Sequence, residues 1–332
     1  MKYLQYKAST KHGEGLLDRR MCLMILLAEA KLSHRIAVLP KFLLGSQHNN
    51  GKKIESYLID TYFDIDKLQV EYILDEEFAE RKKKIDTAHI LNIKNKKIDQ
   101  NSDKTLIVRN LPSDNFWKLK KLGAEVINLA KNYQGVGQKY VIPLVTTPEY
   151  IKAIGDQILN QLERPVIGLH LRRGDRLNKR LNDSMNEKTI INKLEGFNYN
   201  SVFYCSNDQN YRINNDNYFS ISKFKHLVES IGDNYLLFCV EMYIVDNCDI
   251  SVRTFNDSSP FYFIEDQSNK NYSICNYSMH GSNNQAKNIP DELIKCDYVS
   301  YASNDRKGFA KRGITIPRIL NGIRKVFKSV FK

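Results

Sequence analysis

Length, composition and charge indicate a folded protein with two domains and exclude a disordered chain. The chain has 332 residues, of which 42% are hydrophobic and 11% aromatic, and this exceeds the usual size of a single core. Its formal net charge is +12, but nine basic residues and no acidic one lie in 306–332. The sequence therefore does not predict a nucleic-acid-binding surface on the body of the protein.

The cysteines and the N-terminus indicate a protein of the cytoplasm. The six cysteines form no Cys-x-x-Cys pair and no metal-ligand spacing with histidine, so we expect reduced thiols and neither a zinc site nor a disulfide framework. The N-terminal residues lack the apolar core of a signal peptide, and the apolar run Met21–Ala30 is too short to span a bilayer.

The N-terminal part has the pattern of a loop, a helix and a strand. Gly13 and Gly15 precede apolar residues that recur at helical spacing through 16–32, and a β-branched strand then ends at Pro40. A glycine-bearing loop before a helix can bring backbone N–H groups to a ligand, but such loops are more often plain turns. Both interpretations stay open.

The middle of the chain carries fewer signals. Asp75–Ile85 has the pattern of a solvated helix, and Leu106–Val108 that of a short strand. From Thr147 an amphipathic helix is predicted, with Thr147 as its N-cap and Pro148 in its first turn.

The C-terminal half alternates strands and helices. Val166–Leu171 is apolar at nearly every position, as in a strand covered on both faces, and a similar strand begins at Ser201. A helix and a third strand follow before Thr254. This alternation predicts a doubly wound parallel sheet, in which ligands bind beyond the carboxyl ends of the strands.

Polar residues follow all three of these strands and are expected to open onto one crevice. Arginine suits a diphosphate because its guanidinium forms two parallel hydrogen bonds and keeps its charge. A helix that begins near Pro260 would point its N-terminus at the same anion. The sequence therefore predicts a nucleotide-diphosphate pocket. The residues are His170, Arg172, Arg173 and Asp175, then Ser206, Asn207 and Asp208, then Thr254, Asn256, Asp257, Ser258 and Ser259.

Each of these residues also has a structural interpretation. A histidine on an apolar strand, such as His170, is more often a core residue than a catalytic one. Arg173 can face away from Arg172 and pair with Asp175, because successive strand residues alternate faces. The occurrence of three such strand ends in order favours the pocket.

The motifs in these segments resemble those of the fucosyltransferase superfamily, which includes α1,2-, α1,6- and protein O-fucosyltransferases. "HLRRGD" is similar to the family's His-x-Arg-Arg-(Gly/Thr)-Asp motif. "FYCSND" is similar to its strand ending in Ser/Thr-Asp-Asp, and "RTFNDSS" to its Thr-x-Ser-Ser. The resemblance covers residues 10–40 and 160–262.

The resemblance implies a GT-B glycosyltransferase with two Rossmann-like α/β domains that face a cleft. The expected division is an acceptor-side domain in 1–155, a nucleotide-sugar donor domain in 156–300 and a tail in 301–332. The implied reaction is an inverting transfer of fucose from GDP-fucose to a glycan or lipid-linked glycan hydroxyl. It needs no metal or other cofactor and belongs to polysaccharide biosynthesis.

The resemblance also implies roles for individual residues. Arg172 is the catalytic residue that holds the β-phosphate of the leaving GDP, and Arg173 assists it or braces the loop. The other implied donor-binding residues are His170, Asp175, Asp208, Thr254, Ser258 and Ser259, with Gly13 and Gly15 in the N-terminal loop.

The chain departs from the family's pattern at several positions. Asn256 and Asp257 interrupt the third motif. Arg180 stands where some α1,6 members have a proposed catalytic carboxylate, and Arg176 where α1,2 members have tyrosine. The linkage therefore stays open, and so does the catalytic base, for which four carboxylates are candidates: Glu14, Asp18, Asp183 and Glu187.

Two alternative functions remain at this stage. One is a GT-B glycosyltransferase that uses another nucleotide sugar, because phosphate chemistry does not reveal the sugar. The other is a non-catalytic nucleotide-binding protein associated with the membrane.

The C-terminal segment 316–331 has the pattern of a basic amphipathic helix. Apolar residues recur at steps of three and four, basic residues occupy the other face, and acidic residues are absent. Such a helix is typical of an anchor on anionic lipid, although a helix docked on the protein's own core is the alternative. We therefore expect a peripheral protein at the cytoplasmic face of the membrane. The apolar stripe is Ile316, Ile319, Leu320, Ile323, Phe327, Val330 and Phe331.

Overall fold

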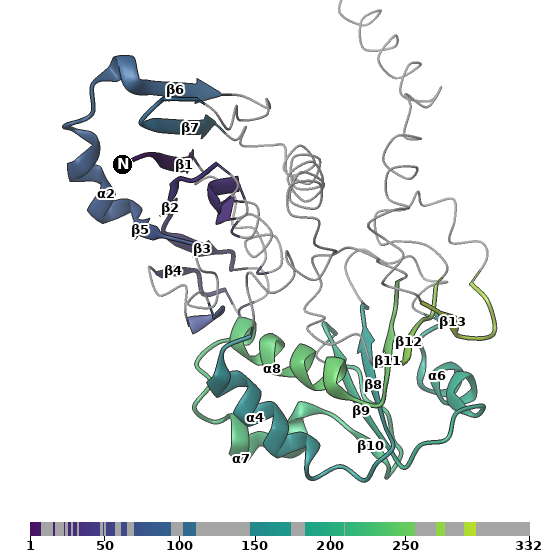
Figure 1. Cartoon of the computed structure of the whole chain (residues 1–332). Coiled ribbons are helices and arrows are strands. Elements are labelled where there is room, and N and C mark those ends of the chain that lie inside the picture. Colours follow the sequence, from purple (N-terminus) through teal and green to yellow (C-terminus); the bar gives the residue numbers. More distant parts are fainter. Residues whose placement is uncertain are drawn as a thin grey trace, which may run out of the picture.

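The computed structural model contains two parallel sheets, one in each half of the chain (Figure 1). It describes residues 1–7, 16, 23, 26–27, 29–31, 33–46, 49, 51–56, 61–64, 70–93, 102–110, 147–173, 183–208, 210–255, 270–275 and 289–296. Seven of the predicted site residues lie outside these ranges, as does the tail 301–332: Gly13, Gly15, Asp175, Asn256, Asp257, Ser258 and Ser259.

The first sheet has the order β5-β2-β1-β7-β6, and every neighbouring pair is parallel. Its central strand β1 is the first of the chain. The chain builds outward through β2 to β5, then forms the opposite edge with β6 and returns to place β7 beside β1. An antiparallel pair, β3 and β4, stands apart from this sheet. The strands are β1 (Tyr3–Lys7), β2 (Ile36–Leu39), β3 (Phe42–Leu44), β4 (Ile54–Ser56), β5 (Tyr72–Leu74), β6 (Ile90–Ile93) and β7 (Leu106–Asn110).

The second sheet has the order β10-β9-β8-β11-β12-β13 and is parallel except for its last strand. From β8 the chain moves outward through β9 to β10, then returns to the other side of β8 with β11. The order therefore reverses between β8 and β11, which is where doubly wound sheets bind ligands. The strands are β8 (Val166–Leu171), β9 (Ser201–Ser206), β10 (Tyr218–Phe219), β11 (Ile250–Arg253), β12 (Lys270–Ser273) and β13 (Ile294–Lys295).

Helices cover both faces of the second sheet (Figure 1). The helices α4 and α8 pack together on one face, and α6 packs on the other. This is why β8 is apolar along its length: Ile167, Leu169 and Leu171 face the α6 layer, and the intervening positions face α8. The helical elements are α2 (Asp75–Lys82), η3 (Thr87–His89), α4 (Glu149–Leu159), α6 (Glu187–Leu194), η6 (Ile221–Phe224), α7 (Lys225–Val228) and α8 (Asn234–Asn247).

The two halves meet at the start of α8. Asp233 caps this helix by accepting the N–H groups of Tyr235 and Leu236, and it also accepts a hydrogen bond of 2.8 Å from the Tyr62 hydroxyl. The Tyr235 hydroxyl donates to the carbonyl of Gly45 at 2.6 Å. One cluster of buried apolar side chains includes residues from both halves, so the core continues across this junction.

The expected α/β class with two Rossmann-like parallel sheets is confirmed, and two details differ from expectation. Thr147 is not the N-cap of α4: Pro148 has an extended ψ of 145° and takes that position, so the helix begins at Glu149. The expected boundary at residue 155 falls inside α4, which packs on α8 and so belongs with the second half. Among the helices that the structure describes, none is long and apolar enough to cross a bilayer.

Candidate functional site

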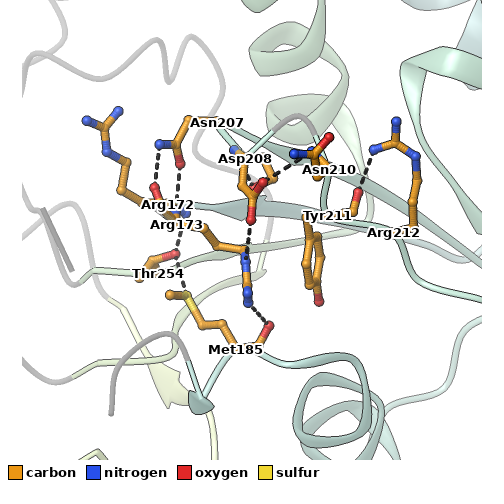
Figure 2. A network of polar contacts seen from close by, with 10 residues as sticks. Arg172, Arg173, Met185, Asn207, Asp208, Asn210, Tyr211, Arg212 and Thr254 are labelled. Carbon is orange, nitrogen blue, oxygen red and sulfur yellow. Dashed lines mark hydrogen bonds and ion pairs between the residues drawn. The ribbon is translucent and has the colours of Figure 1, made fainter. Parts of the chain in front are cut away.

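Three strand ends come together at one edge of the second sheet. β8 lies between β9 and β11 and is parallel to both, with Leu171 opposite Ser206 and His170 opposite Arg253. The residues that follow these strands are therefore neighbours, as Figure 2 shows for Arg172, Asn207 and Thr254. This confirms the predicted convergence for the part of the set that the structure describes.

Side chains from β9 and β11 bind the backbone just beyond β8. The N–H of Arg172 donates to Thr254 Oγ1 at 2.7 Å, and the N–H of Arg173 donates to Asn207 Oδ1 at 2.6 Å. The Asn207 amide nitrogen in turn donates to the carbonyl of Arg173. Thr254 Oγ1 also lies 3.3 Å from the carbonyl of His170. The side chains of Thr254 and Asn207 thus continue the hydrogen bonding of β8 beyond the point where its backbone pairing ends.

Arg173 is directed into the protein. Its guanidinium stacks on the ring of Tyr211 at 4.2 Å, its Nη1 donates to the carbonyl of Met185 at 2.5 Å, and its Nε lies 3.5 Å from Asp208 Oδ2 (Figure 2). Only 15% of the side chain is exposed. Arg173 therefore ties the end of β8 to two other segments.

Arg172 points the other way. Figure 2 shows its guanidinium on the opposite side from the group of Arg173, Asp208 and Tyr211. The reason is the alternation of side chains along an extended backbone: Arg173 continues the α6 side of β8, and Arg172 continues the α8 side. Arg172 is half-buried, and it carries a permanent charge at the point where the strand order reverses.

His170 lies beneath Arg172 on the α8 side of the sheet. Its ring is 5.9 Å from that of Phe238 on α8. Burial, together with the smaller effects of the charges of Arg253 and Arg172, lowers the pKa of His170 to about 3. His170 is therefore neutral at physiological pH, and a neutral imidazole can accept or donate a hydrogen bond.

The positive charge of Arg253 is compensated inside the protein. This side chain ends β11 next to His170 and forms an ion pair with Asp246 of α8, with 3% and 6% of the two side chains exposed. A buried charge requires such a partner. Arg253 contributes to the field at His170, and Arg172 directly follows β8.

Two of the candidate carboxylates are engaged with the protein. Asp208 pairs with Arg173 and accepts the N–H of Asn210 at 3.1 Å. Glu187 accepts the N–H of Asn214 at 2.5 Å. Of the other candidate bases, Asp183 is exposed, and Glu14 and Asp18 lie outside the described residues.

Sequence reasoning did not identify Tyr211 and Met185 as parts of the site. Tyr211 lies in the loop after β9, and burial raises the pKa of its hydroxyl to about 12. Met185 precedes α6 and contributes a main-chain carbonyl. The one signal for Tyr211 was its place three residues after Asp208 in the polar loop, and a carbonyl leaves no signal in a sequence.

Comparisons with known proteins give similar structures but no similar sequence. No family model matches the chain, and no curated protein matches it either. The structure is similar to that of POFUT1 in complex with GDP-fucose, at 12% identity and a TM-score of 0.47, over 81% of this chain and 97% of that one. It is also similar to the fucosyltransferase NodZ from Bradyrhizobium, at 12% identity and a TM-score of 0.48, over 89% of this chain and 98% of that one.

Proposed function

We propose that the chain is a glycosyltransferase that moves fucose from GDP-fucose to a hydroxyl of a glycan or lipid-linked glycan. The observation that carries the proposal is the position of Arg172. It follows the central strand β8, beside the point where the strand order reverses, and it belongs to the "HLRRGD" motif. A diphosphate bound beyond this sheet edge would meet a guanidinium that is directed away from the Arg173 pair.

The proposed chemistry follows from the charges that develop during transfer. As the bond between fucose and GDP breaks, negative charge grows on the β-phosphate and positive character grows on the sugar. Arg172 stabilises the leaving phosphate through paired hydrogen bonds, and it supplies the charge that a divalent ion would otherwise supply. The acceptor hydroxyl attacks from the opposite face of the sugar, which inverts the anomeric centre.

The neighbouring residues support Arg172 in different ways under this proposal. Arg173 braces the segment through Tyr211 and Asp208, in line with the second role that the family resemblance implies for it. His170, held neutral, serves as a hydrogen-bonding group beneath the nucleotide without adding charge. We propose that Asp208 stays with Arg173 when the nucleotide binds.

Thermal unfolding with a panel of nucleotides tests the donor. GDP at about 1 mM is expected to raise the midpoint more than UDP, ADP or CMP, because a ligand that binds only the folded state stabilises it. Arg172→Ala is expected to lose most of this rise. Arg212→Ala is the matched control, since Arg212 is an exposed arginine of the loop after β9 whose Nη1 donates to the carbonyl of Tyr211 (Figure 2).

The same panel separates the alternatives. A larger shift with another nucleoside diphosphate would point to another nucleotide sugar, and binding without turnover would point to a non-catalytic protein. Turnover of GDP-fucose is expected to persist in a chelator. Loss of turnover that manganese restores would contradict the metal-independent mechanism.

The proposal includes a location. A lipid-linked acceptor would lie at the cytoplasmic face of the membrane, and the basic segment 316–331 would hold the enzyme there. This part of the proposal rests on the sequence.

A further inference from the structure

We infer that Asn207 is a positioning residue that sets the direction of the Arg172 side chain. The inference rests on the proposed function, because it assumes that Arg172 binds the diphosphate. Asn207 follows β9, and its amide is hydrogen-bonded to the backbone of Arg173 (Figure 2).

The backbone around Arg172 is held on both sides of its Cα atom. The N–H of Arg172 belongs to the peptide plane before this Cα, and it donates to Thr254 Oγ1 at 2.7 Å. The N–H of Arg173 belongs to the plane after it, and it donates to Asn207 Oδ1 at 2.6 Å. Each peptide unit is planar, so holding both planes restricts the two dihedral angles of Arg172 and thus the direction of its Cβ.

The chemistry of the side chain explains why an amide is suited to this position. Asn207 accepts the N–H of Arg173 with its oxygen and donates to the carbonyl of the same residue with its nitrogen. An amide has both a donor and an acceptor, whereas an ionised carboxylate can only accept. Asn207 therefore holds Arg173 as a neighbouring strand would.

The hydrogen bonds of Asn207 take over where backbone pairing ends. The backbone pairing of β8 with β9 begins with Val166 opposite Ser201 and ends with Leu171 opposite Ser206. Asn207 is the residue that follows β9. Without Asn207, the peptide plane after Arg172 would lose its hydrogen bond to the β9 side, while Thr254 would still hold the plane before it. The guanidinium would then be aimed less accurately, and accurate aim matters for paired hydrogen bonds to phosphate.

A double-mutant cycle on GDP affinity tests this role. In the wild-type background, Asn207→Ala is expected to weaken GDP binding about tenfold, the effect of losing one to two modest hydrogen bonds. In the Arg172→Ala background, the same change is expected to weaken binding less than about twofold, because two residues that act as one unit are non-additive. Asn210→Ala is the matched control, an exposed asparagine of the same loop for which only the backbone N–H makes a contact, and it should stay within about twofold.

The outcomes distinguish this inference from the proposed function. Equal losses in both backgrounds would mean that Asn207 acts on the ligand or on the fold as a whole, and no loss in the wild-type background would mean that it does not act at all. Either result overturns the positioning role. If Arg172→Ala itself leaves GDP affinity unchanged, the phosphate clamp fails instead. The cycle repeated with Thr254→Val, which removes the acceptor on the other side of Arg172, covers the case in which Asn207→Ala does not fold.

Discussion

Arg172 and Arg173 are adjacent in the chain and have opposite surroundings. The guanidinium of Arg173 contacts Tyr211, Asp208 and the carbonyl of Met185. Arg172 is half-buried, and its side chain points to the opposite side (Figure 2). The two arginines therefore differ in function. One is expected to hold a ligand, and the other holds the protein segment from which the first extends.

This difference predicts opposite effects of the same substitution. Arg172→Lys keeps the charge and loses the two-pronged geometry, so turnover of GDP-fucose should fall by about 10² while the melting temperature is unchanged. Arg173→Lys loses the stacking on Tyr211, so the melting temperature should fall. Steady-state kinetics and thermal unfolding of both variants measure this. Near-normal turnover of Arg172→Lys would remove the clamp from the mechanism.

Glu241 of α8 gives a prediction about pH and stability. Burial raises the pKa of its carboxyl to about 8, so the folded state retains a proton that the unfolded chain releases near the ordinary value of about 4.3. Folding then takes up a proton in this interval, and the free energy of unfolding falls as pH rises towards 8. Above about pH 7.5 the unfolded chain has also lost the proton of His170, so His170 is neutral in both states and adds little slope.

The isosteric variant Glu241→Gln removes this titration. Denaturant unfolding between about pH 7.5 and pH 9 should show a decline in stability for the wild type and a smaller decline for the variant. Parallel curves for the two proteins would show that the carboxyl is ionised in the folded state over the whole range.

The residues that meet at the site were predictable to the extent that strand order determines them. Arg172, Asn207 and Thr254 each follow an apolar strand, and parallel strands place their carboxyl ends at one edge. Tyr211 and Met185 were not predictable, because loop conformation brings them to Arg173. Which arginine pairs with Asp208 was also undetermined, since alternation shows that the two side chains differ in direction but not which one meets the loop after β9.

At the level of elements, α8 packs very closely on β8, and a glycine permits this. A Cβ atom at Gly168 would lie 2.8 Å from the Cα and 2.9 Å from the carbonyl oxygen of Val245. Main-chain atoms cannot move aside as a flexible side chain can. The separation between helix and strand therefore depends on the absence of a side chain at this position.

Gly168→Ala should consequently destabilise the protein by about 1–3 kcal/mol through overpacking. Gly196→Ala is the control, because a Cβ at Gly196, just after α6, would have no atom within 4 Å. That variant should change stability by less than about 0.5 kcal/mol or raise it slightly. Urea unfolding of the two variants measures the difference, and similar values for both would contradict the close approach of α8.

The elements of the second half were predictable because their patterns are strong. Val166–Leu171 and the strand that begins at Ser201 are apolar at most positions, and both are strands in the structure. The start of α4 was predicted one residue too early, since the pattern did not show that Pro148 stays extended. The short strands of the first half, such as Ile54–Ser56, have too few residues for a periodicity to emerge.

At the scale of the molecule, the start of α8 links the two halves. Asp233 caps α8 and accepts from Tyr62 of the first half, and Tyr235 donates to Gly45. These contacts come from residues more than 170 positions apart, which local sequence patterns do not reveal. The helix that packs beneath His170 is thus the one that joins the halves, so the site and the junction share one rigid element.

The whole molecule is also the scale of the tail, whose apolar stripe and basic face predict a membrane anchor. A helix docked on the protein's own core would gain nothing from so many cations, whereas each basic residue near an anionic surface contributes about 1 kcal/mol. The full chain is therefore expected to pellet with phosphatidylserine vesicles at low salt and to remain in solution with phosphatidylcholine vesicles.

Removal of the tail tests this anchor. A chain that ends at Asp305 should stay folded and turn over GDP-fucose, and should no longer pellet with anionic vesicles. A full-length variant with Arg324, Lys325 and Lys328 replaced by glutamine keeps the apolar stripe, and it should bind vesicles more weakly because its electrostatic attraction is reduced. Vesicle binding that survives truncation would place the anchor elsewhere. Unfolding of the truncated chain would show instead that the segment packs on the core, since a solvent-facing anchor contributes no burial to the folded domains.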